Sequence, residues 1–185
     1  MKQDKAKNLT TTLDEKNISE LRAGDIVNIS GKMITARDKA YERILELLRE
    51  GGELPVSLEG EVVYHCGPLV SRVGGGWRVV SAGPTTSGRM DDVQVEFVER
   101  TGVKGIVGKG GMGEGVSRRV GELGCVYLGF PGGAGALAAR SVVSVEDVFW
   151  EDLGVAEALW VLNVESFGPL VVGVDLDGGN IYEGE

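Results

Sequence analysis

Residues 105–140, GIVGKGGMGEGVSRRVGELGCVYLGFPGGAGALAAR, decide the fold class of this chain. The apolar runs at residues 105–107 and 125–130 are short, which predicts two buried strands. Residues 113–123 and 134–140 follow these strands, each after a glycine-rich turn, which predicts two helices. Strands that alternate with helices in this way indicate an α/β domain.

The same alternation continues on both sides of this stretch. A helix is predicted from Asp38, because Ala40, Ile44 and Leu48 recur at helical spacing before Gly51 ends the pattern. Another helix is predicted around residues 90–98, and further strands are predicted at residues 25–30, 61–65, 77–81, 158–164 and 170–174. The fold class predicted is α/β, with a mixed β-sheet flanked by helices.

One domain is predicted over residues 18–185. A chain of 185 residues that is 42% hydrophobic can bury most of its apolar surface in a single core, and it has no internal repeat. Residues 1–17 combine charges with a run of threonines and have no helical or strand period. They are therefore predicted to be a flexible lead-in.

Composition and charge narrow the classes of function. The formal net charge of −9 disfavours general binding to nucleic acid or anionic lipid, so any anion site must be local. Cys66 and Cys125 are far apart in the sequence and predict no disulfide framework, which favours a reducing cytoplasm. The N-terminal residues lack a signal-peptide pattern, and no apolar run approaches the ~20 residues of a membrane-spanning helix. We expect a cytoplasmic protein.

Three loops carry cations or hydroxyls among small residues, each between a predicted strand and a predicted helix. Such junctions attract anions, because unpaired N–H groups and the positive end of the helix dipole meet there. The first loop, residues 33–38 (MITARD), offers Arg37, whose planar guanidinium can bind a carboxylate at two points. An ion pair of Arg37 with Asp38 or Glu42 explains the same residue without a ligand.

The second loop is residues 83–91, GPTTSGRMD. It places Thr85, Thr86, Ser87 and Arg89 ahead of a predicted helix. Thr86 or Ser87 can cap that helix, a role that needs no ligand. Capping does not explain two adjacent threonines together with an arginine, so a binding site and a cap both stay open.

The third loop, residues 108–113 (GKGGMG), formally matches the dinucleotide pattern G-x-G-x-x-G. That interpretation is weak, because the next strand ends in Phe130 and Pro131 without an acidic residue to bind a ribose. A Walker phosphate loop fails because Gly110, rather than Ser or Thr, follows Lys109. An anion-binding nest, in which Lys109 adds a charge to backbone amides, and an ordinary glycine-rich turn both remain.

Other chemistry finds little support in the sequence. The single histidine, His65, cannot complete a zinc site beside Cys66, and it cannot serve every candidate nucleophile as a base. His65 is therefore predicted to be structural. Acidic pairs such as Asp91–Asp92 are predicted to lie on solvated faces.

Taken together and in this order, the three loops resemble the small subunit, or C-terminal half, of class I fumarases, a family that also includes L-tartrate dehydratases. The resemblance runs from about residue 21 to residue 182. It rests on T-ARD, GPTT-x-x-RMD and GKGGMG, with a GP pair at Gly67–Pro68 and a closing strand pair near the C-terminus. Each loop alone is unspecific, whereas the set is specific.

The resemblance implies reversible addition of water to a small dicarboxylate, with fumarate to L-malate expected first and L-tartrate dehydration second. It also implies a swivelling β/β/α fold. In the family a [4Fe-4S] cluster held by three cysteines polarises the substrate. This chain has two cysteines, at neither ligand position, so a larger cysteine-bearing alpha subunit is expected to carry the cluster. We expect a heterotetramer with two copies of each subunit, and neither nucleic acid nor membrane as a partner.

The resemblance also implies roles for single residues. The predicted catalytic residue is Thr85, which matches the hydroxyl that exchanges the carbon-bound proton, although a threonine needs a neighbouring base or charge for this role. The predicted substrate-binding residues are Arg37, Thr86, Arg89, Lys109, Gly110 and Gly111. We expect the three cationic turns to converge on one pocket.

Two points stay open. Tyr41 stands where many relatives have histidine, and its spacing from Arg37 predicts that both residues share a helix face and that Tyr41 affects substrate preference. The alternative to an enzyme subunit is a dicarboxylate-binding module without a cluster partner. Thr85 argues against that alternative, because binding alone needs cations and amides more than a second threonine.

Overall fold

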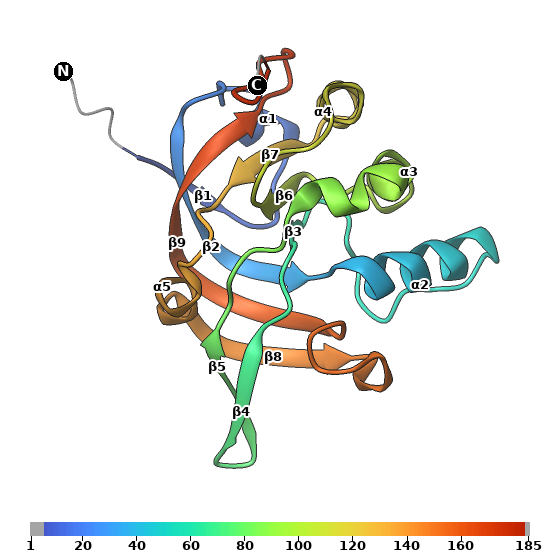
Figure 1. Ribbon diagram of the computed structural model, residues 1–185, viewed down its shortest axis with the longest axis vertical. Helices are drawn as coiled ribbons and strands as arrows, with labels where there is room; N and C mark the ends of the chain where they lie inside the picture. Colours follow the sequence, from blue (N-terminus) through green and yellow to red (C-terminus); the bar gives the residue numbers. More distant parts are fainter. Residues whose placement is uncertain (1–5, 184–185) are drawn as a thin grey trace.

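The computed structural model describes residues 6–183 and contains a seven-stranded mixed sheet (Figure 1). Its strands, in spatial order, are β1 (Lys7–Thr10), β2 (Ile26–Thr35), β3 (Val62–Tyr64), β6 (Gly105–Gly108), β7 (Val126–Gly129), β9 (Leu159–Val174) and β8 (Val142–Phe149). The first five are parallel, whereas β9 runs antiparallel to β7, β8 and β2. Because β2 pairs with both β3 and β9, the strands β2, β3, β6, β7 and β9 close into a ring.

Helices cover this sheet, and α2, α3 and α4 lie together on one side of it (Figure 1). The helices are α1 (Glu15–Ile18), α2 (Asp38–Arg49), α3 (Asp91–Thr101), α4 (Glu114–Glu122) and α5 (Gly135–Arg140), with 3-10 turns η1 (Ser87–Met90) and η2 (Glu151–Leu153). A separate hairpin consists of β4 (Leu69–Val73) and β5 (Gly76–Ser81). The predicted α/β class, with a mixed sheet flanked by helices, is confirmed. Within residues 6–183, no helix has the length and apolar character needed to span a membrane.

Alternating side chains on the strands fill two hydrophobic cores. In β3, Val62 and Tyr64 pack in one core with Trp160, whereas Val63 packs in the other core with helix residues such as Ile44. Strands buried on both faces appear in a sequence as continuous apolar runs. This explains why β3, β6 and β7 were recognisable from the sequence.

The N-terminal segment differs from the expected flexible lead-in at residues 1–17. Residues 1–5 lie outside the described part of the chain, but β1 pairs in parallel with β2, and Leu9, Leu13 and Ile18 are buried. Three isolated apolar residues in a polar segment form no period. Their burial depends on tertiary neighbours, which local pattern does not reveal.

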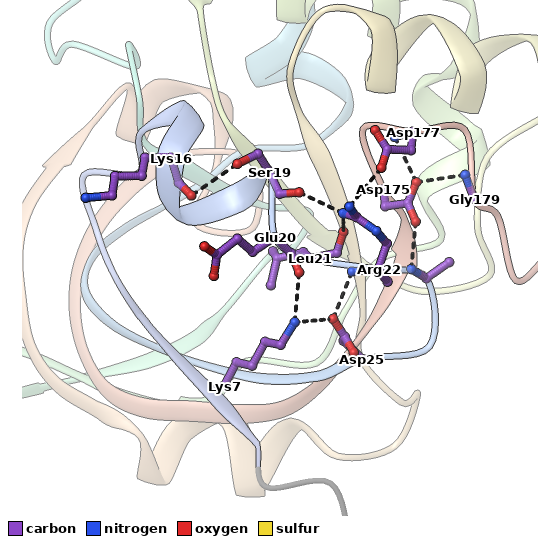
Figure 2. Close-up of polar contacts among 11 residues, drawn as sticks. Lys7, Lys16, Ser19, Glu20, Leu21, Arg22, Asp25, Asp175, Asp177 and Gly179 are labelled. Atoms are coloured by element: carbon purple, nitrogen blue, oxygen red, sulfur yellow. Dashed lines mark hydrogen bonds and ion pairs between the residues drawn. The ribbon is translucent and has the colours of Figure 1, made fainter.

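Polar contacts hold this segment against the ends of β2 and β9 (Figure 2). Lys7 Nζ lies 2.7 Å from Asp25 Oδ2, and its hydrogen bond lowers the pKa of Asp25. Asp175 is buried at the end of β9 and accepts hydrogen bonds from the amides of Ala23 (2.8 Å) and Gly179 (2.7 Å). One carboxylate therefore connects the approach to β2 with the C-terminal turn.

Strand β9 joins two segments that were predicted as separate strands, residues 158–164 and 170–174. Pro169, which lies between these two segments, cannot donate a ladder hydrogen bond. In the structure β9 pairs with β8 before this residue and with β7 after it, and its register with β2 shifts around Ile29. Pairing between β2 and β9 therefore continues across the register shift at Ile29, and β9 completes the ring as a single strand.

Candidate active site

The candidate site lies where the parallel strands β2, β3 and β6 end, because loops that follow parallel strands gather at one edge of a sheet. Strand β2 ends two residues before Arg37, and β6 ends directly before Lys109. The Thr85 loop reaches the same edge, since the Thr85 N–H donates to the His65 carbonyl (2.6 Å) just beyond β3. The three predicted loops therefore meet at this edge.

The second and third loops are joined backbone to backbone. Thr86 and Lys109 form an isolated parallel β-bridge. The Lys109 N–H donates to the Thr85 carbonyl (3.3 Å), and the Ser87 N–H donates to the Lys109 carbonyl (3.0 Å). The segment from Thr85 to Ser87 thus extends the sheet beside the end of β6.

Arg37 and Arg89 meet at one carboxylate, that of Asp38. Arg37 Nε lies 3.0 Å from Asp38 Oδ2 and 2.9 Å from Glu157 Oε1. Arg89 contacts Asp38 Oδ1 through Nε (3.0 Å) and Nη2 (2.9 Å). Burial alone would raise the pKa of Asp38, but the hydrogen bond from Arg37 and the charge of Arg89 outweigh it and lower that pKa. Two guanidinium groups therefore already share one carboxylate, which is the kind of partner a diacid would offer them.

The side chain of Lys109 lies apart from the two arginines. It lines a pocket of about 640 Å³ and passes beside Gly132, where an added Cβ would lie 3.5 Å from Lys109 Cδ. The other lining residues are mostly apolar: Ile26, Gly110, Gly129, Phe130, Pro131, Pro169, Val171, Ile181 and Tyr182. Arg37 and Arg89 do not line it. The expectation that all three cationic turns converge on one pocket is therefore not met. The turns share one edge of the sheet, but in the described chain Arg37 and Arg89 contact Asp38, whereas Lys109 lines the pocket.

The other predicted site residues differ in accessibility. Thr85 is half-buried and Thr86 is exposed. Gly110 and Gly111 have φ angles of 76° and 71°, which favour glycine because a Cβ strains this conformation. The Gly111 N–H donates to the Tyr127 hydroxyl (3.3 Å), so this amide already has a partner within the chain. Substrate binding by Gly110 and Gly111 stays a prediction.

A buried row of hydroxyls and one imidazole beneath these loops was missed by the sequence analysis. His65 Nε2 lies 2.7 Å from the Tyr41 hydroxyl, and His65 Nδ1 lies 2.9 Å from Ser87 Oγ. Ser87 Oγ is 3.1 Å from the Tyr127 hydroxyl, and Gln94 Nε2 donates to the Tyr41 hydroxyl (3.3 Å). The available signal was a tyrosine or histidine, whose ring carries a polar atom, inside an apolar run, as in VVYHC and CVYLGF. His65 is structural in the sense predicted, yet it lies directly under the site.

Tyr41 faces this buried row and not the ligand side. Its ring stacks on Phe97 with centroids 3.8 Å apart and an interplanar angle of 14°. Tyr41 is completely buried, whereas Arg37 is partly accessible. Tyr41 therefore does not share the accessible surface of Arg37, because packing between α2 and α3 turns its ring inward. An effect of Tyr41 on substrate preference stays a prediction.

Asp91 also departs from the predicted solvated face. Its Oδ2 accepts a hydrogen bond from the Gly113 N–H (2.8 Å), and burial raises its pKa. An added Cβ on Gly113 would lie 3.0 Å from this oxygen. Asp91 therefore connects the second and third loops by a further hydrogen bond.

The cysteines of this chain do not fit an iron–sulfur cluster. Cys66 and Cys125 are buried in different hydrophobic cores. Burial raises the pKa of the Cys66 thiol to about 12 and also raises that of Cys125, whereas a cluster needs thiolate ligands. Between residues 6 and 183, no three His, Cys, Asp or Glu side chains are grouped so that they could hold a metal ion.

We expect the His65 ring to stay neutral in the folded chain. Burial lowers its pKa to about 3, whereas an exposed histidine titrates near about 6.5. Between these two pKa values, only the unfolded chain binds a proton at His65. The contribution of neutral His65 to the unfolding free energy is therefore complete above about pH 6.5 and is lost as pH falls toward 3. NMR measures this directly, because the chain has one histidine. Its ring signals should not titrate between about pH 8 and pH 5, and a midpoint near 6.5 would contradict the burial.

A His65→Gln chain provides the matched control for stability. Wild type should lose about 2 kcal/mol more unfolding free energy than this variant between about pH 7.5 and pH 5. Urea unfolding at both pH values measures the difference. Equal losses would show that the imidazole is accessible to protons in the folded state.

Comparison with known proteins agrees with this architecture. The family model described as "Fumarase C-terminus" matches residues 1–184. The L(+)-tartrate dehydratase subunit beta of Escherichia coli (strain K12) is 41% identical over 173 residues, which cover 94% of this chain and 85% of that protein. A protein of Methanocaldococcus jannaschii named "Putative L(+)-tartrate dehydratase subunit beta" is 45% identical over 172 residues, or 92% of this chain and 88% of that protein.

A longer relative connects the chain to fumarate hydratases. The protein of Geobacillus stearothermophilus named "Putative fumarate hydratase class I" is 36% identical over 176 residues, which cover 95% of this chain but 33% of that protein. These relatives are named as hydro-lyases, and those of similar length are named as beta subunits. With a family match over nearly its whole length, the chain belongs to the Fumarase C-terminus family, as the beta-type component shared by tartrate dehydratases and class I fumarate hydratases.

Proposed function

We propose that this chain is one subunit of a two-subunit hydro-lyase that adds water to, or removes it from, a four-carbon dicarboxylate. The main support for this proposal is the isolated β-bridge between Thr86 and Lys109, called the backbone joint below. It fixes two cationic loops and a pair of threonines at one edge of the sheet. In a chain with net charge −9, such cations attract an anion only locally. The names of the relatives support the reaction class.

A larger partner subunit completes the enzyme in this proposal. The family resemblance implies a [4Fe-4S] cluster, and the two buried cysteines of this chain do not fit it. The cluster therefore belongs to an alpha subunit, where it would supply Lewis-acid chemistry. The designation "subunit beta" of the relatives supports such a partner. A heterotetramer with two copies of each subunit is the assembly proposed.

The role of the arginines is to bind one substrate carboxylate. Asp38 accepts hydrogen bonds from both guanidinium groups, so the site already has the geometry for a carboxylate there. Both ion pairs of Arg37 use Nε, and in this proposal its Nη groups bind the substrate carboxylate. The ammonium group of Lys109 binds the second carboxylate. Substrate carboxylates at these positions would neutralise local positive charge that the acidic chain otherwise balances with Asp38 and Glu157.

Thr85 is the proposed proton-transfer group. In the dehydration direction Thr85 first gives its hydroxyl proton to the activating group, and its deprotonated oxygen then takes the carbon-bound proton as the carbon–oxygen bond breaks. The proton held by the activating group goes to the leaving hydroxide and forms water, and hydration reverses these transfers. Its backbone is fixed on both sides, since its N–H binds the His65 carbonyl and its carbonyl accepts from Lys109. A threonine hydroxyl is too weakly acidic to act alone at neutral pH, so nearby cations or the partner must activate it.

Fumarate and L-malate are the first candidate substrates, and L-tartrate is the second. The walls of the pocket beside Lys109 are mostly apolar, which suits the unsaturated carbons of fumarate and offers few partners to the additional hydroxyl of tartrate. The names of the relatives of similar length favour tartrate. Both substrates therefore belong in the first assay.

The test is co-expression with the larger subunit, anaerobic reconstitution of its cluster, and separate assays with L-malate, fumarate and L-tartrate. We expect turnover of at least one of them by the complex and none by either subunit alone. Faster turnover of malate and fumarate supports the first candidate, and faster turnover of tartrate selects the second. A complex that binds these acids without turning over any of them would instead support a dicarboxylate-binding module.

Arg89→Ala or Lys109→Ala should raise KM and lower kcat of the complex. Each truncation leaves a substrate carboxylate unpaired, which costs about 1–3 kcal/mol, or roughly 5- to 150-fold in kcat/KM. Steady-state kinetics measure the effect. Arg100→Ala, on the outer end of α3, and Lys104→Ala, before β6, are charge-matched controls that should stay near wild type. Unchanged kinetics for a site variant would remove that residue from the site.

Thr85→Val should retain substrate binding and lose most turnover. Valine has nearly the shape of threonine without the hydroxyl, so kcat should fall by about 100-fold or more while KM changes little. Thr10→Val, which removes an exposed hydroxyl from β1, is the control. Near-normal kcat in Thr85→Val would show that another group moves the proton.

A further inference from the structure

We propose that Ser87 is a positioning residue whose buried hydroxyl locks the Thr85 loop to the Gly111 loop, so that both move as one unit. Its kinetic consequence rests on the function proposed above, whereas the lock itself rests on geometry alone. Ser87 is completely buried at the start of the turn η1, whereas Gly88 and Arg89, which follow it, are exposed. The site therefore has a polar anchor below its surface.

The Ser87 hydroxyl oxygen contacts two residues directly, and each of these contacts one further element. Ser87 Oγ lies 2.9 Å from His65 Nδ1 at the end of β3 and 3.1 Å from the Tyr127 hydroxyl on β7. Tyr127 in turn accepts a hydrogen bond from the Gly111 N–H (3.3 Å), and His65 contacts Tyr41 on α2 (2.7 Å). A hydroxyl next to Thr86 thus reaches the glycine loop by a route separate from the backbone bridge.

The space around this hydroxyl is fitted to it. A Cβ built on Gly108 would lie 1.9 Å from Ser87 Oγ and 3.2 Å from His65 Nδ1. Gly108 does not have a positive φ, so the backbone conformation does not require glycine there. The first glycine of GKGGMG is therefore needed to leave room for the Ser87–His65 hydrogen bond, a role that neither a phosphate motif nor an ordinary turn explains.

The chemistry of the row requires a neutral imidazole. A neutral ring donates through one nitrogen and accepts through the other, and each hydroxyl can do both. Ser87 and Tyr41 can therefore be satisfied on either side of His65, whereas a doubly protonated ring would only donate. Buried polar groups that are fully paired rigidify their surroundings, and one that loses its partner is costly.

Ser87 is not used as a helix cap. The sequence left capping by Thr86 or Ser87 open, but neither η1 nor α3 has a side-chain cap hydrogen bond. The serine hydroxyl turns inward to His65 and Tyr127. Its removal would leave His65 Nδ1 without a partner and would take one of the partners of the Tyr127 hydroxyl, while keeping the exposed surface of the loop unchanged.

The test combines hydrogen exchange and kinetics of Ser87→Ala in the reconstituted complex. Without substrate, amides in both segments, residues 84–90 and 108–113, should exchange about fivefold faster or more. With substrate, kcat should fall by about 10- to 100-fold while KM stays within about threefold, because Thr85 is misplaced but the cations remain. Thr101→Val is the matched control: it removes a buried hydroxyl that donates to the Phe97 carbonyl (2.6 Å) and should change neither readout.

Wild-type exchange in both segments of Ser87→Ala, or faster exchange in residues 84–90 alone, would overturn the lock. If Ser87→Ala does not fold, Tyr127→Phe removes another hydroxyl of the same row, and it should speed exchange in both segments. Unchanged exchange in a folded Tyr127→Phe complex would also overturn the lock. A wild-type complex that turns over none of the diacids would remove the proposed function alone, because the exchange comparison needs no substrate.

Discussion

The short backbone joint between Thr86 and Lys109 is the interaction on which the candidate site depends. It brings together loops that lie more than twenty positions apart in the sequence, and the hydrogen bonds of Thr85 and Ser87 extend it on both sides. Without it, an arginine loop and a lysine loop would move independently over the end of the sheet. With it, a local set of cations persists in a chain whose overall charge repels anions.

A closed ring of strands gives this joint its support. Strand β9 pairs with β2 along most of its length and with β7 beyond Pro169, so the parallel strands that end at the site have no free edge between them. Hydrophobic cores lie on both faces of these strands. Beneath the loops, the space left by Gly108 admits the Ser87–His65 contact. The hydrophobic cores and the Ser87–His65 hydrogen bond therefore both restrain the backbone at the end of these strands.

Much of the fold follows from local sequence, because strands buried on both faces and amphipathic helices such as α2 have clear periods. The N-terminal strand and the continuity of β9 do not follow, since they depend on tertiary pairing around Leu9 and Pro169. Motif spacing indicated the three loops and the family. It did not indicate that Tyr41 points inward or that Asp38 is shared by both arginines, because these outcomes depend on helix packing and on charges brought together by folding.

Both cationic loops bind one diacid in the function proposed for this chain. A structure of the two-subunit complex with an unreactive four-carbon dicarboxylate tests this most directly. We expect one ligand carboxylate within about 3.2 Å of a guanidinium nitrogen of Arg37 or Arg89, and the other carboxylate at a similar distance from Lys109 Nζ. A ligand that contacts only one of these loops, or neither, would contradict it.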